Sequence, residues 1–156
     1  MKEIQINTNT TNNTKVLEID GKINTKVPGN SKSQIIPIIP NMEKRFYDLK
    51  ERTFKFALDI LDVSALLPKN LESDIIRKQL VRSGTSVGAN IEEADGVLTK
   101  ADFINKLAIS RKEVKETKYW LNIIKAKYLK HEKIDIAINE SLELVKIFSS
   151  IINKTR

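Results

Sequence analysis

The sequence predicts an all-α protein, an antiparallel four-helix bundle that follows a flexible N-terminal tail. Three observations support this fold class. The 156 residues include only five glycines and four prolines, while Lys, Glu, Leu and Ile are abundant, and this balance favours helices over a turn-rich β architecture. After residue 40, apolar residues recur at intervals of three and four, which is the period of an α-helix. The chain is also long enough to bury one hydrophobic core.

Residues 1–40 differ in composition from the rest of the chain. Asn, Thr, Lys and Ser are abundant there, and Pro37 and Pro40 stand close to the end of the segment. Such a segment buries too little apolar surface to offset the entropy of ordering it, so we expect a flexible polar tail. The apolar runs Val16–Ile19 and Ile35–Ile39 are exceptions, because each is long enough for a short strand or a docking segment.

The first two helices are expected at about residues 42–66 and 72–95. The first ends before Pro68, and Asn70 or Ser73 is expected to cap the second, which ends just before Gly96. The predicted core stripe of the first helix consists of Phe46, Leu49, Thr53, Phe56, Ile60, Val63 and Leu67. That of the second consists of Ile76, Leu80, Ser83 or Gly84, Val87, Ile91 and Ala94.

The third and fourth helices are expected at about residues 100–128 and 133–153. Thr99 followed by Asp102 resembles a capping box at the start of the third helix. Short loops between four such helices favour an antiparallel bundle, which makes residues 41–156 one domain. The predicted stripe of the third helix consists of Phe103, Leu107, Ser110, Val114, Thr117, Leu121 and Ile124. That of the fourth consists of Ile134, Ala137 or Ile138, Ser141, Val145, Phe148 and Ile152.

The composition excludes most catalytic chemistry. The sequence has no cysteine and one histidine, His131, so thiol catalysis, disulfides and zinc clusters are not expected. A di-iron site in a bundle commonly needs Glu three residues before His, where this chain has Tyr128. We therefore expect no enzyme activity, metal or cofactor. No segment resembles a membrane span or a signal peptide, which predicts a cytoplasmic protein.

A polar band on the second helix is not explained by the core. Its four residues recur at i, i+4, i+8 and i+11, roughly opposite the apolar stripe, and could equally form a solvated outer face. Beside the band, Gly84 and Gly88 indicate either close helix packing or a weak, slightly kinked helix. The band consists of Arg82, Ser86, Asn90 and Glu93.

The third helix carries two further features away from its stripe. The only tryptophan lies on a face typical of protein interfaces, unless a wide apolar stripe buries it. A basic row uninterrupted by acids could bind phosphates or could be a solvated lysine face; residues 99–133 hold ten bases against four acids, out of a net charge of +7. The tryptophan face consists of Ile109, Glu113, Glu116, Trp120 and Ile123, and the basic row of Arg111, Lys115, Lys118, Asn122 and Lys125.

Over about residues 44–153 the chain resembles a bacterial four-helix-bundle family. This family is known from proteins encoded in intervening sequences of 23S rRNA genes, and it includes the accessory variability determinant of diversity-generating retroelements. Where members usually read Asn-Ile-Ala-Glu-Gly, this chain delays the glycine to Gly96, which predicts a slightly longer second helix. The resemblance rests on Arg82, Ser86, Asn90, Ile91 and Glu93, followed by Phe103, Leu107, Ile109, Ser110, Glu113 and Glu116.

The resemblance implies a homopentameric barrel without catalysis of its own. In the retroelement branch such a barrel binds nucleic acid and the reverse transcriptase, so RNA, DNA and that enzyme are implied partners. A protein-interaction scaffold with no nucleic-acid role is the competing hypothesis. The expected nucleic-acid contacts are Arg111, Lys115, Lys118 and Lys125. The expected oligomer interface consists of Arg82, Ser86, Asn90, Glu93, Ile109 and Trp120.

Overall fold

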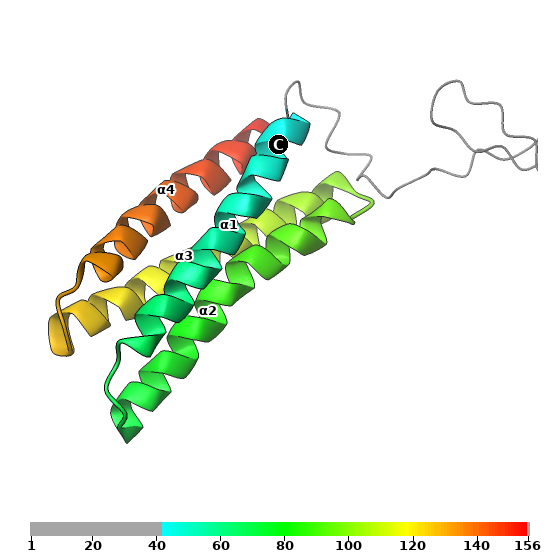
Figure 1. The fold of residues 1–156 in the computed structure, drawn as a ribbon. Coiled ribbons are helices and arrows are strands. Elements are labelled where there is room, and N and C mark those ends of the chain that lie inside the picture. The colour runs from blue at the N-terminus through cyan, green and yellow to red at the C-terminus, as the bar shows by residue number, and fades with distance from the viewer. Residues whose placement is uncertain (1–41, 156) are drawn as a thin grey trace, which may run out of the picture. The chain divides into compact units, whose positions relative to one another are not determined.

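The computed structural model describes residues 42–155, which form a four-helix bundle (Figure 1). The helices are α1 (Met42–Ala65), α2 (Leu71–Asp95), α3 (Lys100–Lys127) and α4 (Glu132–Thr155). No strand occurs within the described range, and the predicted all-α class is confirmed. The helix ends differ from the expected ends by at most two residues. The expected tail, residues 1–40, lies outside the described residues.

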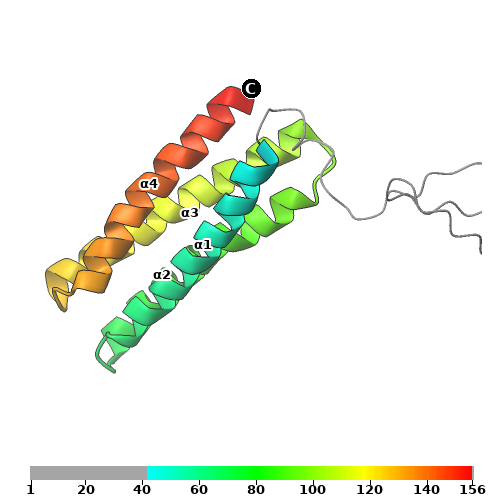
Figure 2. The ribbon, with the colours of Figure 1, turned by 45° about the horizontal axis from the view of Figure 1, so that its top comes forward.

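Consecutive helices run antiparallel, and each packs beside the next (Figures 1 and 2). The most extensive packing joins α2 to α3, followed by α3 to α4 and α1 to α2, and the packing of α1 against α4 is the least extensive of these four. The connections between helices are only four or five residues long, which is typical of antiparallel neighbours. The α3 helix therefore has a packed neighbour on each side, and its outward surface lies between α2 and α4.

Local sequence signals set several helix ends. Of the two caps proposed for α2, Asn70 is the one used, and its side chain accepts a hydrogen bond from the backbone N–H of Ser73 at 2.9 Å. Thr99 caps α3 in the same way, accepting from the N–H of Asp102 at 3.1 Å. Gly96 follows α2 as expected, and its φ of −97° is a conformation open to any residue.

The core confirms most of the predicted apolar stripes. Every predicted position of α1 and α3 is buried, and in α2 only Ile76 is half-buried. In α4 the prediction of Val145 was wrong, because Leu144 is fully buried and Val145 only packs at the edge of the core. A helix turn allows a step of three or four residues, and the step from Ser141 is three.

Gly84 allows α1 and α2 to approach closely. A Cβ atom at this position would lie 2.7 Å from Cγ2 of Ile60 on α1, far inside the normal contact distance. At Gly88 the nearest atom to such a Cβ is the carbonyl oxygen of Thr53 at 3.5 Å, which is an ordinary contact. The close-packing interpretation therefore holds for Gly84 alone.

Candidate functional site

The basic row of α3 lies along the side of the helix that faces α4. At one end, Arg111 donates a hydrogen bond from Nη1 to the Ser149 hydroxyl of α4 at 3.3 Å. At the other end, the ammonium group of Lys125 forms an ion pair with Asp135 of α4 at 2.5 Å. Both ends of the row therefore contact α4.

The middle of the row consists of Lys115, which is exposed, and Lys118, which is half-buried. Neither has an ion-pair partner within residues 42–155. The contacts of Arg111 and Lys125 set an antiparallel register that places Leu142 and Val145 of α4 opposite these two lysines. Because both opposing residues are uncharged, no carboxylate from the facing side of α4 offsets this positive charge.

The polar band of α2 lies on the opposite side of α3. Arg82 forms an ion pair with Glu116, and Glu93 forms one with Lys106, so both ends of the band are bound to α3. Between them, the Asn90 amide donates to the backbone carbonyl of Ser86 at 2.9 Å. We call this surface the α2–α3 seam. It consists of Arg82, Ser86, Asn90 and Glu93 on α2 and of Ile109, Glu113, Glu116 and Trp120 on α3.

One carboxylate on the α2–α3 seam is not satisfied. The Oε2 atom of Glu113 is buried and has no hydrogen-bond partner among the described residues. The two ion pairs of the seam set a register that places Glu113 level with Ser86, in the middle of the polar band. A buried oxygen without a donor costs about 1–3 kcal/mol, and more when it is charged.

Trp120 falls between the two interpretations that the sequence left open. It is half-buried and packs against the edge of the core, while its indole Nε1 donates to Glu116 at 3.4 Å. Tyr119 stands edge-on to it, with ring centroids 5.1 Å apart, and is 59% exposed. Ile109 and Ile123 are also half-buried. This face of α3 is therefore partly apolar and only partly covered.

An exposed apolar stripe on α1 was not predicted from the sequence. Phe54, Leu58 and Leu61 are 64%, 47% and 43% exposed. They recur at i, i+4 and i+7, so they lie on one face of the helix beside the core stripe. The spacing of these three residues can be seen in the sequence. It was not predicted because the sequence analysis assigned only one apolar stripe to this helix, the stripe that forms the core. Three large apolar side chains in one row are typical of a surface that another molecule covers.

A cluster of charges joins the start of α1 to the end of α2. The ammonium group of Lys50 lies 2.8 Å from Glu92 and 2.9 Å from Asp95. Hydrogen bonds from Lys50 to these carboxylates raise its pKa above the ordinary value. These two ion pairs therefore link α1 to the end of α2.

His131 is exposed in the turn before α4, where its Nδ1 atom accepts a hydrogen bond from the backbone N–H of Lys133 at 3.1 Å. Within residues 42–155, no three His, Cys, Asp or Glu side chains are grouped to hold a metal ion.

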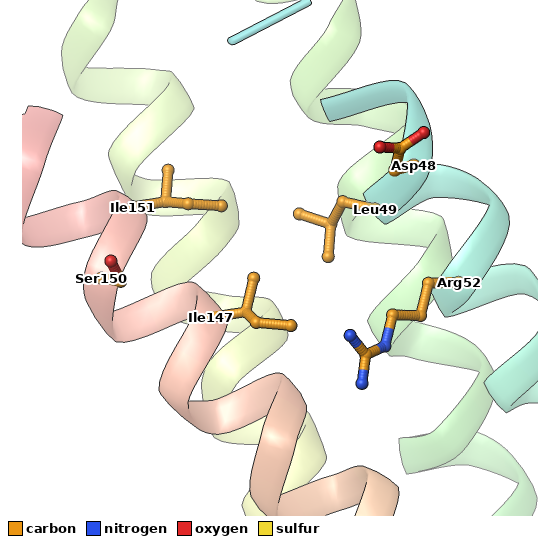
Figure 3. Close-up of a pocket in the computed structure, with 6 residues that line it drawn as sticks. All are labelled: Asp48, Leu49, Arg52, Ile147, Ser150 and Ile151. Carbon is orange, nitrogen blue, oxygen red and sulfur yellow. The ribbon is translucent and has the colours of Figure 1, made fainter. Parts of the chain in front are cut away.

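A groove between α1 and α4 is lined mainly by aliphatic side chains (Figure 3). In the same range, no helix is both long enough and apolar enough to pass through a membrane.

Residues 47–150 match the 23S rRNA-intervening sequence protein family. A crystal structure of a protein of unknown function from the S23 ribosomal protein family of Bacteroides thetaiotaomicron is 41% identical in sequence. It superposes with a TM-score of 0.61, and the alignment covers 66% of this chain and 96% of that one. Among curated proteins, none matches this chain. Because the family match spans two thirds of the sequence, the chain belongs to the 23S rRNA-intervening sequence protein family.

Proposed function

We propose that this protein is an oligomeric, non-enzymatic accessory factor that binds RNA or DNA through the basic row of α3. The observation that carries the proposal is the pair Lys115 and Lys118, two cations without anionic partners among the described residues. Ammonium groups on a helix surface contact phosphates as point charges, and they do not read base edges. Binding should therefore depend strongly on salt and weakly on sequence.

The test replaces only the two unpaired lysines. In the double variant Lys115→Glu and Lys118→Glu, affinity for structured RNA and for duplex DNA should fall at least about tenfold at about 50 mM salt. The slope of log affinity against log salt should also become shallower, since fewer phosphates are neutralised. Fluorescence anisotropy over about 50–200 mM salt measures both quantities. Arg111 and Lys125 stay unchanged because their contacts with α4 support the fold.

The matched control places the same change in charge elsewhere. Lys55 on α1 and Lys78 on α2 are exposed and have no ion-pair partner within residues 42–155. The double variant Lys55→Glu and Lys78→Glu should bind almost as well as the wild type. Equal losses in the two variants would mean that binding follows net charge alone. A wild type that fails to bind at low salt would contradict the proposal.

Self-association supports the same function, because a ring of protomers repeats the basic row around one assembly. A closed ring needs two different faces on each protomer, which meet head to tail. The α2–α3 seam, with its unsatisfied Glu113 oxygen, and the apolar stripe of α1 are two such faces. We expect five protomers, as the family resemblance implies. A reverse transcriptase would be a further partner if the protein belongs to the retroelement branch.

The second candidate function is a protein-interaction scaffold with no nucleic-acid role. The exposure of Phe54, Leu58 and Leu61 favours it, because these side chains suit an apolar partner surface. Salt distinguishes the two functions, since an apolar interface is insensitive to the salt concentrations that release phosphate contacts. A wild type without affinity for RNA or DNA at about 50 mM salt would leave the scaffold as the better account.

A further inference from the structure

The groove between α1 and α4 lies at the end of the bundle where α1 begins. Its volume is about 310 Å³. Figure 3 shows Leu49 of α1 and Ile147 of α4 pointing toward one another across the groove. The lining residues are Asp48, Leu49, Arg52, Ile147, Ser150 and Ile151.

The chemistry of the groove selects an apolar occupant. Leu49, Ile147 and Ile151 supply most of the lining, and both isoleucines are only half-buried. The guanidinium group of Arg52 is already engaged by Glu140, with two hydrogen bonds of 2.5 and 2.8 Å. This carboxylate raises the pKa of Arg52, so the guanidinium stays charged at any ordinary pH. Two of its five N–H donors are therefore occupied, and its positive charge is already paired with a carboxylate.

We propose that the apolar run Ile35–Ile39 of the same chain occupies this groove. The run ends three residues before Met42, the first residue of α1. From Met42 to Leu49 the helix rises about 10 Å, and five extended residues reach up to about 17 Å. A chain that turns back at Pro40 and Asn41 can therefore lie along the groove beside the first turns of α1.

The two prolines suit the run to this position. A residue before proline is confined to extended conformations, which fixes Ile36 before Pro37 and Ile39 before Pro40. A groove between two helices offers no backbone hydrogen-bond partners, since helical N–H and C=O groups are paired within each helix. Proline has no N–H, so a run that contains it brings fewer unpaired donors into the groove.

A spin label in the groove tests the contact in the full chain. The sequence has no cysteine, so Ser150→Cys gives a single labelling site on the exposed rim of the groove. NMR signals of residues 35–39 should broaden when the label is at position 150. The control label is at Lys130→Cys, an exposed position just before α4. The helix rises about 27 Å between Glu132 and Ser150, so with this label the same signals should stay sharp. Unbroadened signals with the label at 150 would overturn the proposal.

Mixing separates the same chain from a neighbouring copy. Chains that carry the spin label at position 150 but no isotope are mixed with isotope-enriched chains that carry no spin label. A second sample contains only chains that carry both the isotope and the spin label. The proposal is supported if the signals of residues 35–39 broaden in this second sample and stay sharp in the mixture. Broadening in the mixture means that the run enters the groove of another copy, which overturns it. Sharp signals in both samples indicate another occupant of the groove and also overturn it.

Stability gives an independent measurement. The double variant Ile36→Ser and Ile38→Ser should lower the Tm of the full chain by about 5 °C, because apolar area in the groove returns to water. The matched variant Val16→Ser and Ile19→Ser, in the other apolar run of residues 1–40, should leave the Tm unchanged. Equal Tm values for the two variants would contradict the proposal. Neither variant touches α3, so nucleic-acid binding is tested separately.

Discussion

At the scale of single residues, Gly84 is the position where a methyl group does most harm. The Gly84→Ala variant gains about 1 kcal/mol of helix propensity. It also forces a Cβ atom against Ile60, at 2.7 Å from Cγ2, and such overpacking costs about 1–3 kcal/mol. We expect a net loss of up to about 2 kcal/mol in the free energy of unfolding, measured by urea denaturation.

Gly88 is the matched control for this prediction. A Cβ atom there meets Thr53 only at ordinary contact distance, so Gly88→Ala should gain up to about 1 kcal/mol. Opposite signs for the two variants are the expected result. A stabilised Gly84→Ala variant would show that Ile60 moves aside and that the helices are not held at this distance.

The single histidine shows how much of the possible chemistry can be predicted from residue types alone. The absence of cysteine and the presence of one histidine, His131, narrow the possible chemistry without any knowledge of the packing. Its position in the turn before α4 gives it a local hydrogen bond to the backbone of Lys133. The unsatisfied Glu113 oxygen is not predictable in this way, because its burial depends on how α2 and α3 pack.

At the scale of helices, Lys50 links α1 to the end of α2 and makes stability depend on alkaline pH. Glu92 and Asp95 raise its pKa in the folded state above 10.5. This contribution is therefore complete below about pH 10.5 and is lost as the pH rises through the folded-state pKa. The Lys50→Gln variant should be less stable at about pH 8 by about 1 kcal/mol or less.

The pH profile separates this effect from general alkaline denaturation. Unfolding free energies of the wild type and Lys50→Gln should converge above about pH 10.5. The Lys55→Gln variant, which removes an exposed lysine without an ion pair in the described range, should track the wild type throughout. A constant difference between Lys50→Gln and the wild type up to about pH 12 would refute the assignment.

Helix patterns predicted the core more completely than the outer surfaces. A core stripe follows from the period of one helix. Val145 was placed wrongly, one residue from Leu144, and Ile76 is half-buried, whereas the remaining predicted stripes are buried. Contacts such as Lys125 with Asp135 depend on the register between two helices, which one helix pattern does not contain. For this reason the residues of the basic row were predicted, but the contacts of Arg111 and Lys125 with α4 were not.

At the scale of the whole molecule, the exposed apolar stripe of α1 predicts self-association. Light scattering or sedimentation of the wild type at micromolar concentration should show an oligomer, and we expect five protomers. The double variant Phe54→Ser and Leu58→Ser should weaken association at least about tenfold, because these side chains are 64% and 47% exposed and lie outside the core. Its helical content should stay unchanged.

The control variant is Leu71→Ser with Ile136→Ser, which removes two comparably exposed apolar side chains from other helices. Its assembly should match that of the wild type. Trp120→Glu is a poorer test of the interface, since Trp120 also packs against the core and its replacement would destabilise the protomer. A monomeric wild type would contradict the oligomer and leave the apolar stripe for a different partner.

The order of packing between the helices also bears on how the chain folds. Each helix packs mainly on its neighbour in sequence, and α1 packs less extensively on α4. Packing between consecutive helices is typical of helical bundles, which fold in about microseconds to milliseconds. Successive helical hairpins can therefore form as the ribosome releases them, before the last helix has been synthesised.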